Sequence, residues 1–168
     1  MSERKSMPAV TSFTADGAHV LRARVYYEDT DAGGVVYHAN YLRFAERGRT
    51  EYLRDLGISQ SELSDAEGVF FVVRRSVIDF RLPARLDDAL EIATRIAETK
   101  GASFEVEQEI RKTGTDGHLV RVASTIACID AKGRPVRVPK SVREKLDRPI
   151  MAGTNQEPPK ADVQKSGD

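Results

Sequence analysis

The sequence predicts an α+β fold in which an antiparallel sheet of five or six strands curls around one long helix. One segment has helical periodicity, and the segments after it alternate with a period of two. Short turns that contain glycine and have the length of hairpin loops connect several of these segments. A sheet with one apolar and one charged face needs a cover on its apolar side, and the long helix supplies it.

Composition and charge indicate one soluble domain. The chain has 168 residues, and 26 basic residues balance 26 acidic ones, so bulk charge gives no reason to expect nucleic acid as a partner. The one cysteine, Cys128, excludes an internal disulfide and fits a reducing compartment. The N-terminus lacks the apolar core of a secretory signal, and no run approaches the ~20 apolar residues of a membrane span. We therefore expect a cytoplasmic protein without a membrane span.

The composition divides the chain into three parts. Residues 1–17 are small and polar without a period, which predicts a disordered N-terminal segment. Residues 152–168 are rich in proline and polar residues, which predicts a disordered C-terminal tail. The folded domain is therefore expected to span residues 18–151.

A strand is expected to open the domain, in VLRARVYY (residues 20–27). Leu21, Ala23 and Val25 alternate with polar residues, the period of a half-buried strand. This alternation puts Tyr27 on the apolar face at the end of the strand, directly before an acidic segment.

The long helix is predicted in NYLRFAERGRTEYLRDLG (residues 40–57), where apolar residues recur at spacings of three and four. Gly57 is a suitable C-terminal stop. Gly48 lies within the apolar stripe, where glycine costs about 1 kcal/mol relative to alanine. We therefore expect the helix to approach its neighbour closely at Gly48. Ser59 and Glu62 form a capping-box pattern, which predicts a second, short helix.

The remaining strands are predicted from alternation alone. They are expected in RRSVIDFRL (74–82), LEIATRIA (90–97), SFEVEQEIRK (103–112) and LVRVASTIACI (119–129). In the first of these, Phe80 and Leu82 are expected on the apolar face. Ser141 and Glu144 predict the cap of a C-terminal helix in SVREKL.

The segment YYEDTDAGGVVYHANY (residues 26–41) concentrates two carboxylates, a Gly-Gly pair and a histidine. It lacks two ligands of a calcium loop, and the chain has no dinucleotide fingerprint, P-loop, G-x-S-x-G or H-E-x-x-H. What remains is acid–base or nucleophilic chemistry by Asp31. If the helix starts near His38, its unpaired backbone N–H groups can stabilise an oxyanion opposite this carboxylate. The alternative is that Asp29 and Asp31 only form a turn and cap the helix.

Other polar residues admit a chemical and a structural interpretation. His38 can donate a proton or be structural, and Tyr27 can place its hydroxyl in the same pocket or belong to the core. Glu46 can line the pocket or face solvent, whereas Cys128 is expected to pack in the core. A basic patch can hold phosphates or serve solubility, and it consists of Lys132, Arg134, Arg137 and Lys140.

The stretch RVYYEDTDAGGVVYHANYLRFAERGRTEYLR (residues 24–54) resembles the signature of hotdog-fold acyl-CoA thioesterases of the Tol-Pal-associated (YbgC-like) type. These belong to the 4-hydroxybenzoyl-CoA thioesterase superfamily. The stretches FVVRRSVIDFRLPARLDDALEI and RPVRVPKSV are similar to the same family. The resemblance implies a hotdog fold, sheets of two subunits paired edge to edge with active sites at their interface, and homotetramers in many members. It implies a hydrolase that converts acyl-CoA to free acid and CoA without metal or other cofactor.

The resemblance also implies roles for individual residues. Asp31 is the implied nucleophile or general base, and His38 and Tyr27 are implied participants. The backbone N–H near His38 is implied to polarise the thioester carbonyl. Residues expected to bind substrate are Tyr37, Asn40, Glu46, Arg134, Arg137 and Lys140.

Two other functions stay open at this point. One is an adaptor that binds acyl carrier protein or an envelope-associated partner, with incidental hydrolysis. The other is a hotdog dehydratase. The sequence leaves open the acyl chain, the choice between CoA and carrier protein, the nucleophilic or water-activated route, and the choice between dimer and tetramer.

Overall fold

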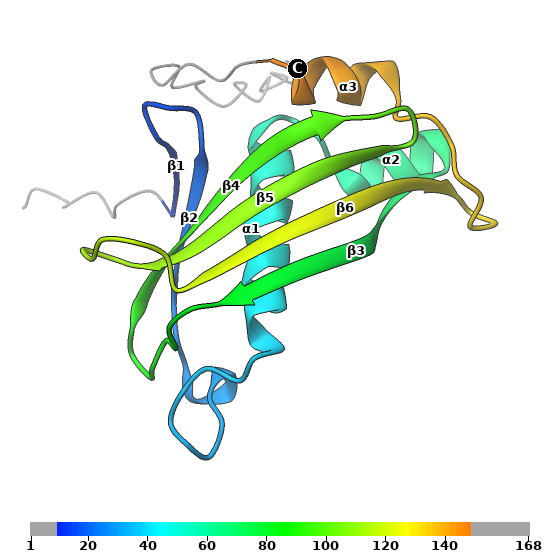
Figure 1. Ribbon diagram of the computed structural model, residues 1–168. Helices are drawn as coiled ribbons and strands as arrows, with labels where there is room; N and C mark the ends of the chain where they lie inside the picture. Colours follow the sequence, from blue (N-terminus) through cyan, green and yellow to red (C-terminus); the bar gives the residue numbers. More distant parts are fainter. Residues whose placement is uncertain (1–9, 149–168) are drawn as a thin grey trace, which may run out of the picture.

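A six-stranded antiparallel sheet with strand order β1-β2-β4-β5-β6-β3 forms the body of the protein (Figure 1). The computed structural model describes residues 10–148, so the predicted C-terminal tail and residues 1–9 lie outside the described part. The strands are β1 (Thr11–Phe13), β2 (His19–Arg24), β3 (Val69–Phe80), β4 (Ala89–Thr99), β5 (Ser103–Lys112) and β6 (Val120–Asp130). The helical elements are η1 (Tyr27–Asp29), α1 (Asn40–Asp55), α2 (Gln60–Glu67) and α3 (Lys140–Leu146). The predicted α+β fold is confirmed.

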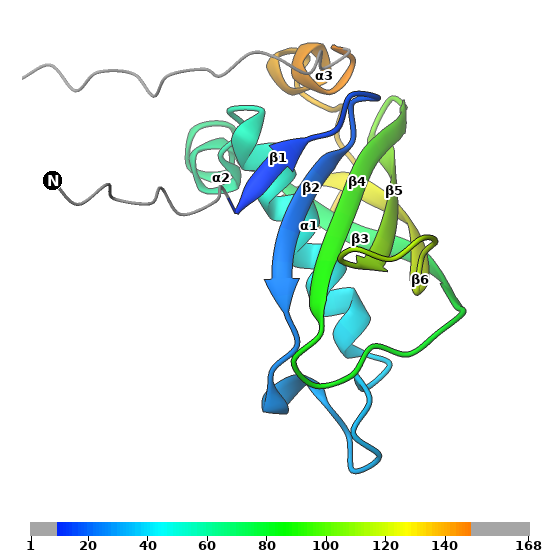
Figure 2. The ribbon, with the colours of Figure 1, turned by 90° about the vertical axis from the view of Figure 1, so that its left-hand side faces the viewer.

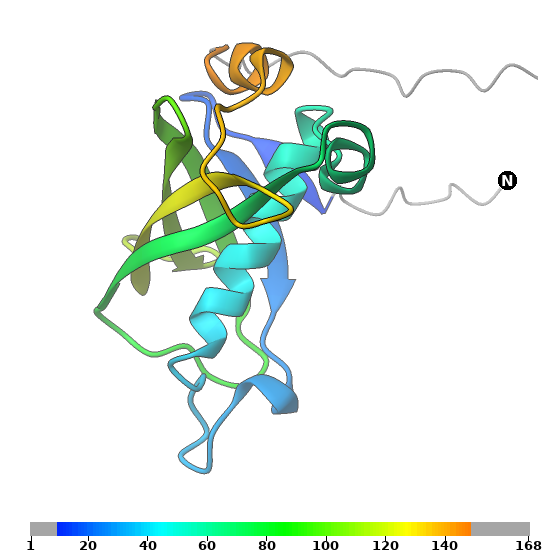
Figure 3. The ribbon, with the colours of Figure 1, turned by 90° about the vertical axis from the view of Figure 1, so that its right-hand side faces the viewer.

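Helix α1 lies along one face of the curved sheet, as the side views show (Figures 2 and 3). Its apolar stripe, including Phe44 and Leu53, is buried against inward-facing residues such as Ile92 and Phe104. The other face of β4 and β5 carries charged residues, as the alternation predicts. No helix in the part of the chain that the structure describes has the length and hydrophobicity needed to cross a membrane.

The predicted close approach at Gly48 is confirmed. A Cβ atom at this position would lie 2.6 Å from Cγ2 of Ile92 and 3.1 Å from Nε2 of Gln108. The Gln108 amide donates to the carbonyl of Ala45 at 2.8 Å and to Oγ1 of Thr94 at 3.0 Å. The sheet therefore contacts the backbone of α1 directly, and only glycine leaves room for this contact.

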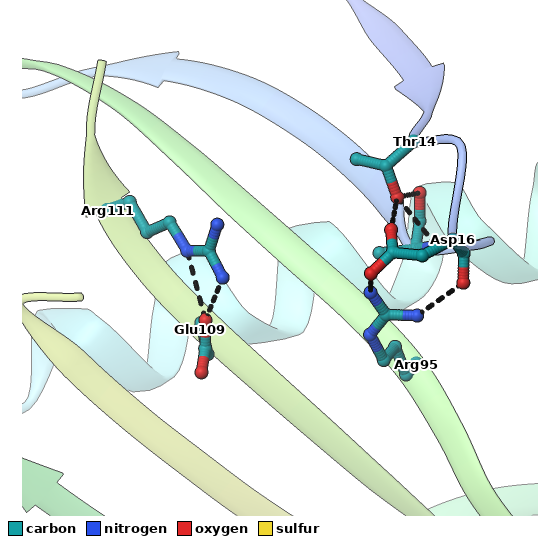
Figure 4. Close-up of polar contacts among 6 residues, drawn as sticks. Thr14, Asp16, Arg95, Glu109 and Arg111 are labelled. Carbon is teal, nitrogen blue, oxygen red and sulfur yellow. Dashed lines mark hydrogen bonds and ion pairs between the residues drawn. The ribbon is translucent and has the colours of Figure 1, made fainter. Parts of the chain in front are cut away.

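The prediction of disorder is wrong for residues 11–17. Residues Thr11–Phe13 pair with β2, and the turn that follows is attached to the outer face of the sheet. There Arg95 donates to the backbone oxygen of Asp16 at 2.7 Å and forms an ion pair with its carboxylate (Figure 4). Oγ1 of Thr14 accepts the N–H of Ala18 at 2.9 Å inside the same turn. A strand of three residues is too short to show a period, so alternation alone misses it.

Strand β3 differs from the predicted segment 74–82 at both ends. It begins at Val69, inside an apolar run that shows no alternation, and ends at Phe80. Leu82 lies beyond the strand and is 56% exposed, and Phe80 is 50% exposed at the end of this edge strand, so neither is buried on the apolar face as predicted. A bulge between Val73 and Arg75 further interrupts the period of two.

The capping prediction holds for α2 and fails for α3. Oγ of Ser59 accepts the N–H of Glu62 at 3.3 Å at the start of α2. Helix α3 instead has Pro139 as its N-cap residue and no side-chain cap, so Ser141 lies inside the first turn. Proline cannot donate a backbone hydrogen bond, and it is well suited to a helix start, where that donor has no partner.

A buried histidine joins β2 to the C-terminal end of α1. His19 is fully buried, its Nε2 lies 2.9 Å from Oδ2 of Asp55, and its ring contacts those of Phe13 and Tyr52. Its Nδ1 has no hydrogen-bond partner within residues 10–148. Burial lowers the pKa of His19, although the carboxylates of Asp55 and Glu51 oppose this shift.

We expect this histidine to make the protein less stable in acid. In the unfolded chain His19 binds its proton near the ordinary pKa of 6.5, whereas the folded protein binds it only at lower pH. The stability contribution is therefore complete above that value and is lost as the pH falls toward the folded pKa. Urea unfolding at about pH 7.5 and about pH 5.5 should show a larger acid loss in wild type than in His19→Gln. Equal losses in the two proteins would contradict the expectation.

Candidate active site

The acidic segment forms a loop between β2 and α1. After η1 the chain makes a hairpin whose two limbs meet at a bridge between Thr30 and Val36. Asp31 lies in this hairpin, where its N–H donates to the Val35 carbonyl at 2.9 Å and its carbonyl accepts from Gly34 at 3.0 Å. Gly34 has a φ of 75°, in the left-handed region that favours glycine. The Gly-Gly pair therefore allows the tight turn on which Asp31 lies.

The carboxylate of Asp31 is exposed and only half engaged. Oδ1 accepts the N–H of Gly33 at 2.8 Å, which fixes the side chain against its own turn. No residue that the structure describes engages Oδ2. Asp31 therefore has a fixed orientation and one oxygen available for chemistry.

Asp29, the first acid of the motif, has different surroundings. It is 5% exposed, and its Oδ2 accepts the N–H of Tyr26 at 2.8 Å. Its backbone oxygen accepts the N–H of Tyr37 at 2.9 Å and the side-chain amide of Asn40 at 2.8 Å. Asn40, predicted to bind substrate, is 7% exposed, and its amide is engaged in holding this loop. Asp29 therefore has a purely structural role in the turn, whereas Asp31 supports the turn with only one of its two carboxylate oxygens.

The start of α1 has no side-chain cap, so the alternative in which Asp29 and Asp31 cap this helix does not hold. The helix begins at Asn40, with Ala39 as the N-cap residue, no side-chain cap and no acidic residue in the first turn. Within residues 10–148, no hydrogen bond engages the backbone N–H of His38 or Ala39. These donors carry the positive end of the helix dipole, so this position suits an oxygen that gains negative charge.

Aromatic rings surround His38, which is exposed. Its ring lies 4.4 Å from that of Tyr37 and meets the ring of Phe80, at the end of β3, edge-on at 6.4 Å. Phe80 also meets Tyr41, whose hydroxyl accepts the N–H of Ala84 at 2.9 Å. Burial raises the pKa of the Tyr41 phenol, which keeps it protonated. The connection from β3 to β4 thus supports the histidine end of the loop.

Of two other predicted site residues, Tyr27 lies elsewhere than expected, and Glu46 forms an ion pair within the chain. Tyr27 is 83% exposed at the start of η1, so its predicted place on the apolar face is wrong. The chain turns before reaching it, because β2 ends at Arg24. Glu46 is about half exposed on α1 and forms an ion pair with Arg49, whose side chain is nearly buried.

The predicted basic residues lie between β6 and α3, at the opposite end of β3 from the Asp31 loop (Figure 1). The guanidinium of Arg134 forms an ion pair with the carboxylate of Asp130 at 2.8 Å, and Nζ of Lys140 lies 3.9 Å from Oε1 of Glu144. Arg137 is exposed and has no ion pair among residues 10–148. One chain therefore does not bring these cations to Asp31.

Two further features lie apart from this loop. Cys128 is fully buried, as predicted, and burial raises the pKa of its thiol to about 11, which keeps it unreactive. A cavity of about 610 Å³ lies between the β1–β2 turn and the outer face of the sheet, and none of the predicted site residues lines it. Asp31 itself is exposed in the single chain.

Comparisons with known proteins agree with one another. A family model described as the thioesterase-like superfamily matches residues 25–146. The acyl-CoA thioesterase YbgC of Haemophilus influenzae is 45% identical over 129 residues, which cover 76% of this chain and 93% of that protein. The acyl-CoA thioester hydrolase YbgC of Escherichia coli O6:H1 is 49% identical over 121 residues, with 71% and 88% covered. The crystal structure of a probable thioesterase from Bartonella henselae has a TM-score of 0.69 and 46% identity, covering 73% of this chain and all of that one.

Proposed function

The chain belongs to the thioesterase-like superfamily, and from this premise we propose that its Asp31 loop is the site of thioester hydrolysis. The protein is an acyl-CoA thioester hydrolase, an enzyme that cleaves acyl-CoA to a carboxylic acid and CoA. Its sheet, wrapped around one long helix, has the hotdog fold. The observation that carries the site assignment is the free Oδ2 of Asp31 on the loop that leads into the uncapped start of α1.

The chemistry requires few groups. Oδ2 of Asp31 either attacks the thioester carbonyl carbon, which gives an acyl-aspartyl anhydride that water then hydrolyses to the free acid, or takes a proton from a water molecule that attacks this carbon directly. The carbonyl oxygen gains negative charge and accepts hydrogen bonds from the backbone N–H groups of His38 and Ala39. The bond to sulfur then breaks, and the CoA thiol leaves easily because its pKa resembles the ~8.5 of cysteine.

His38 and Tyr27 supply the remaining functions in this proposal. The imidazole of His38 is exposed between the loop and Phe80, where it donates a proton to the departing sulfur or orients the substrate. The hydroxyl of Tyr27 is exposed and has no protein partner among the described residues, so it is free to contact substrate. The reaction uses no cofactor other than the CoA moiety of the substrate.

We place the complete site at an interface between two copies of the chain. β3 is an edge strand with several exposed apolar side chains, namely Phe70, Val72, Val73, Val77 and Phe80. An apolar edge of this length attracts another strand. Two copies related by a two-fold axis pair such edges antiparallel, so the start of the partner's β3 approaches the Phe80 end of this one. Arg137 of the partner subunit then approaches the Asp31 loop and becomes a candidate for the CoA phosphates.

Charges on this edge are expected to separate the subunits. The double variant Val73→Lys/Val77→Lys should be monomeric in size-exclusion chromatography with light scattering, because lysine on an edge strand opposes pairing. Its kcat/KM should fall by at least about tenfold if the partner completes the site. Val10→Lys, a change at another exposed apolar residue, is the matched control. A variant that keeps both the wild-type mass and activity would refute the interface, and the wild-type mass distinguishes dimer from tetramer.

Thiol release from short, long and aromatic acyl-CoAs tests the proposed function directly. We expect saturable release with at least one class, and the preferred class identifies the acyl group. Absence of release from every substrate, together with stoichiometric capture of an acyl carrier protein, would instead support the adaptor function.

A further inference from the structure

The Asp31 hairpin and the start of α1 meet at one buried oxygen atom, the backbone carbonyl of Asp29. This oxygen accepts two hydrogen bonds, from the Tyr37 N–H at 2.9 Å and from the Asn40 side-chain amide at 2.8 Å. A carbonyl oxygen has two lone pairs, so both of its acceptor positions are used. The first bond comes from the returning limb of the hairpin and the second from the first residue of α1.

The Asn40 amide supplies a connection that no other side chain duplicates. Among the described residues, it makes the single side-chain hydrogen bond between helix α1 and the loop from β2 to α1 that carries Asp31. The helix start has no side-chain cap that would hold it in another way. Asn40 is 7% exposed and Asp29 is 5% exposed, so water does not readily replace the bond.

The carboxylate of Asp29 holds the other side of the same junction. Its Oδ2 accepts the N–H of Tyr26 at 2.8 Å, at the point where the chain has just left β2. Asp29 therefore links the end of the sheet, the hairpin and the helix. The reactive geometry depends on all three, because Asp31 lies on the hairpin and the oxyanion donors lie at the helix start.

We propose that Asn40 is a positioning residue, which sets the distance between the Asp31 carboxylate and the N–H groups at the start of α1 through the Asp29 carbonyl. The inference rests on the proposed function, in which these two features act on the same thioester. It assigns the two acids of the motif to different tasks, with Asp31 in the reaction and Asp29 in the support of the loop. A displacement of about 1 Å between reacting groups can reduce turnover by about 100-fold.

The test compares Asn40→Ala with wild type in thiol release. We expect kcat to fall by about 10-fold to 100-fold, because the carboxylate and the oxyanion donors are no longer held in register. KM should change by less than about threefold, since no substrate contact is removed. Gln108→Ala is the matched control, because its buried amide also donates to a backbone carbonyl at 2.8 Å, that of Ala45 farther along α1. It should lower the melting temperature and leave the kcat of the folded enzyme within about twofold of wild type.

A second variant gives a signature that general loss of stability does not. Asn40→Asp has nearly the same shape, but its ionised carboxylate cannot donate to the Asp29 carbonyl, whereas the protonated acid can. The ratio of its kcat to that of wild type should therefore rise as the pH falls. A ratio that is independent of pH, or an Asn40→Ala variant with wild-type kcat, would overturn the proposal.

Hydrogen exchange separates this inference from the proposed function. Asn40→Ala should speed exchange of the Tyr37 amide, because the shared acceptor is loosened, and Gln108→Ala should not. This readout needs no substrate. If wild type hydrolyses no acyl-CoA, the proposed function fails, and unchanged exchange at Tyr37 would refute the positioning role independently.

Discussion

Replacement of Asp31 by asparagine should lower kcat for acyl-CoA hydrolysis by about 10³-fold. An amide neither attacks a thioester nor accepts a proton from water, so the chemical step loses its main participant. The fold should be unaffected, since an amide oxygen can still accept the Gly33 N–H that Oδ1 of Asp31 now accepts at 2.8 Å. Melting temperature and oligomeric mass should therefore match those of wild type.

Glu28→Gln is the matched control for this variant. Glu28 is an exposed carboxylate on the same loop, so its replacement removes the same charge near the site. It should retain wild-type kcat if the effect at Asp31 is chemical rather than electrostatic. An Asp31→Asn enzyme with more than about a tenth of the wild-type kcat would contradict the assignment of the carboxylate.

The sequence was sufficient to predict those features that repeat. The apolar stripe of α1 recurs over several turns, and the inward-facing residues of β4 and β5 alternate over most of each strand, so both were found close to their actual limits. Gly48 is predictable from the sequence because a glycine inside a buried helical stripe costs stability, which a close approach of the neighbouring element can offset. The motif around Asp31 indicated the loop that carries the candidate chemistry.

The structural features that could not be predicted from the sequence depend on individual contacts between residues. The strand Thr11–Phe13 leads into a turn in which Asp16 bonds to Arg95, a residue far away in the chain (Figure 4). Asn40 is buried because the loop folds back onto the start of α1. The periodicity of apolar residues does not predict this contact. The sequence predicts that the basic residues near Arg137 bind substrate, but in one chain they follow β6 at the end of β3 opposite the Asp31 loop, and their approach to it requires a second copy.

Substitution at Gly48 should have the largest effect on stability. Even a methyl group would lie 2.6 Å from Cγ2 of Ile92, so Gly48→Val must push α1 away from the sheet. We expect a loss of about 3 kcal/mol in the free energy of unfolding, at the upper end for overpacking of a core. For a domain of this size that corresponds to a fall of about 6–12 °C in melting temperature. Urea and thermal unfolding of the variant measure both quantities.

Gly101→Ala distinguishes this steric effect from the general cost of replacing glycine. A Cβ atom added at Gly101 would have no atom within 4 Å, and the φ of Gly101 is not positive. Its replacement should therefore change the free energy of unfolding by less than about 0.5 kcal/mol. The same displacement should also reduce catalysis, because Gly48 is two turns from the start of α1 and a shifted helix carries the N–H donors away from Asp31. Folded Gly48→Ala enzyme should therefore show a lower kcat than Gly101→Ala. Equal stability and equal kcat in these two alanine variants would show that α1 tolerates movement against the sheet and that its contact at Gly48 does not align the site.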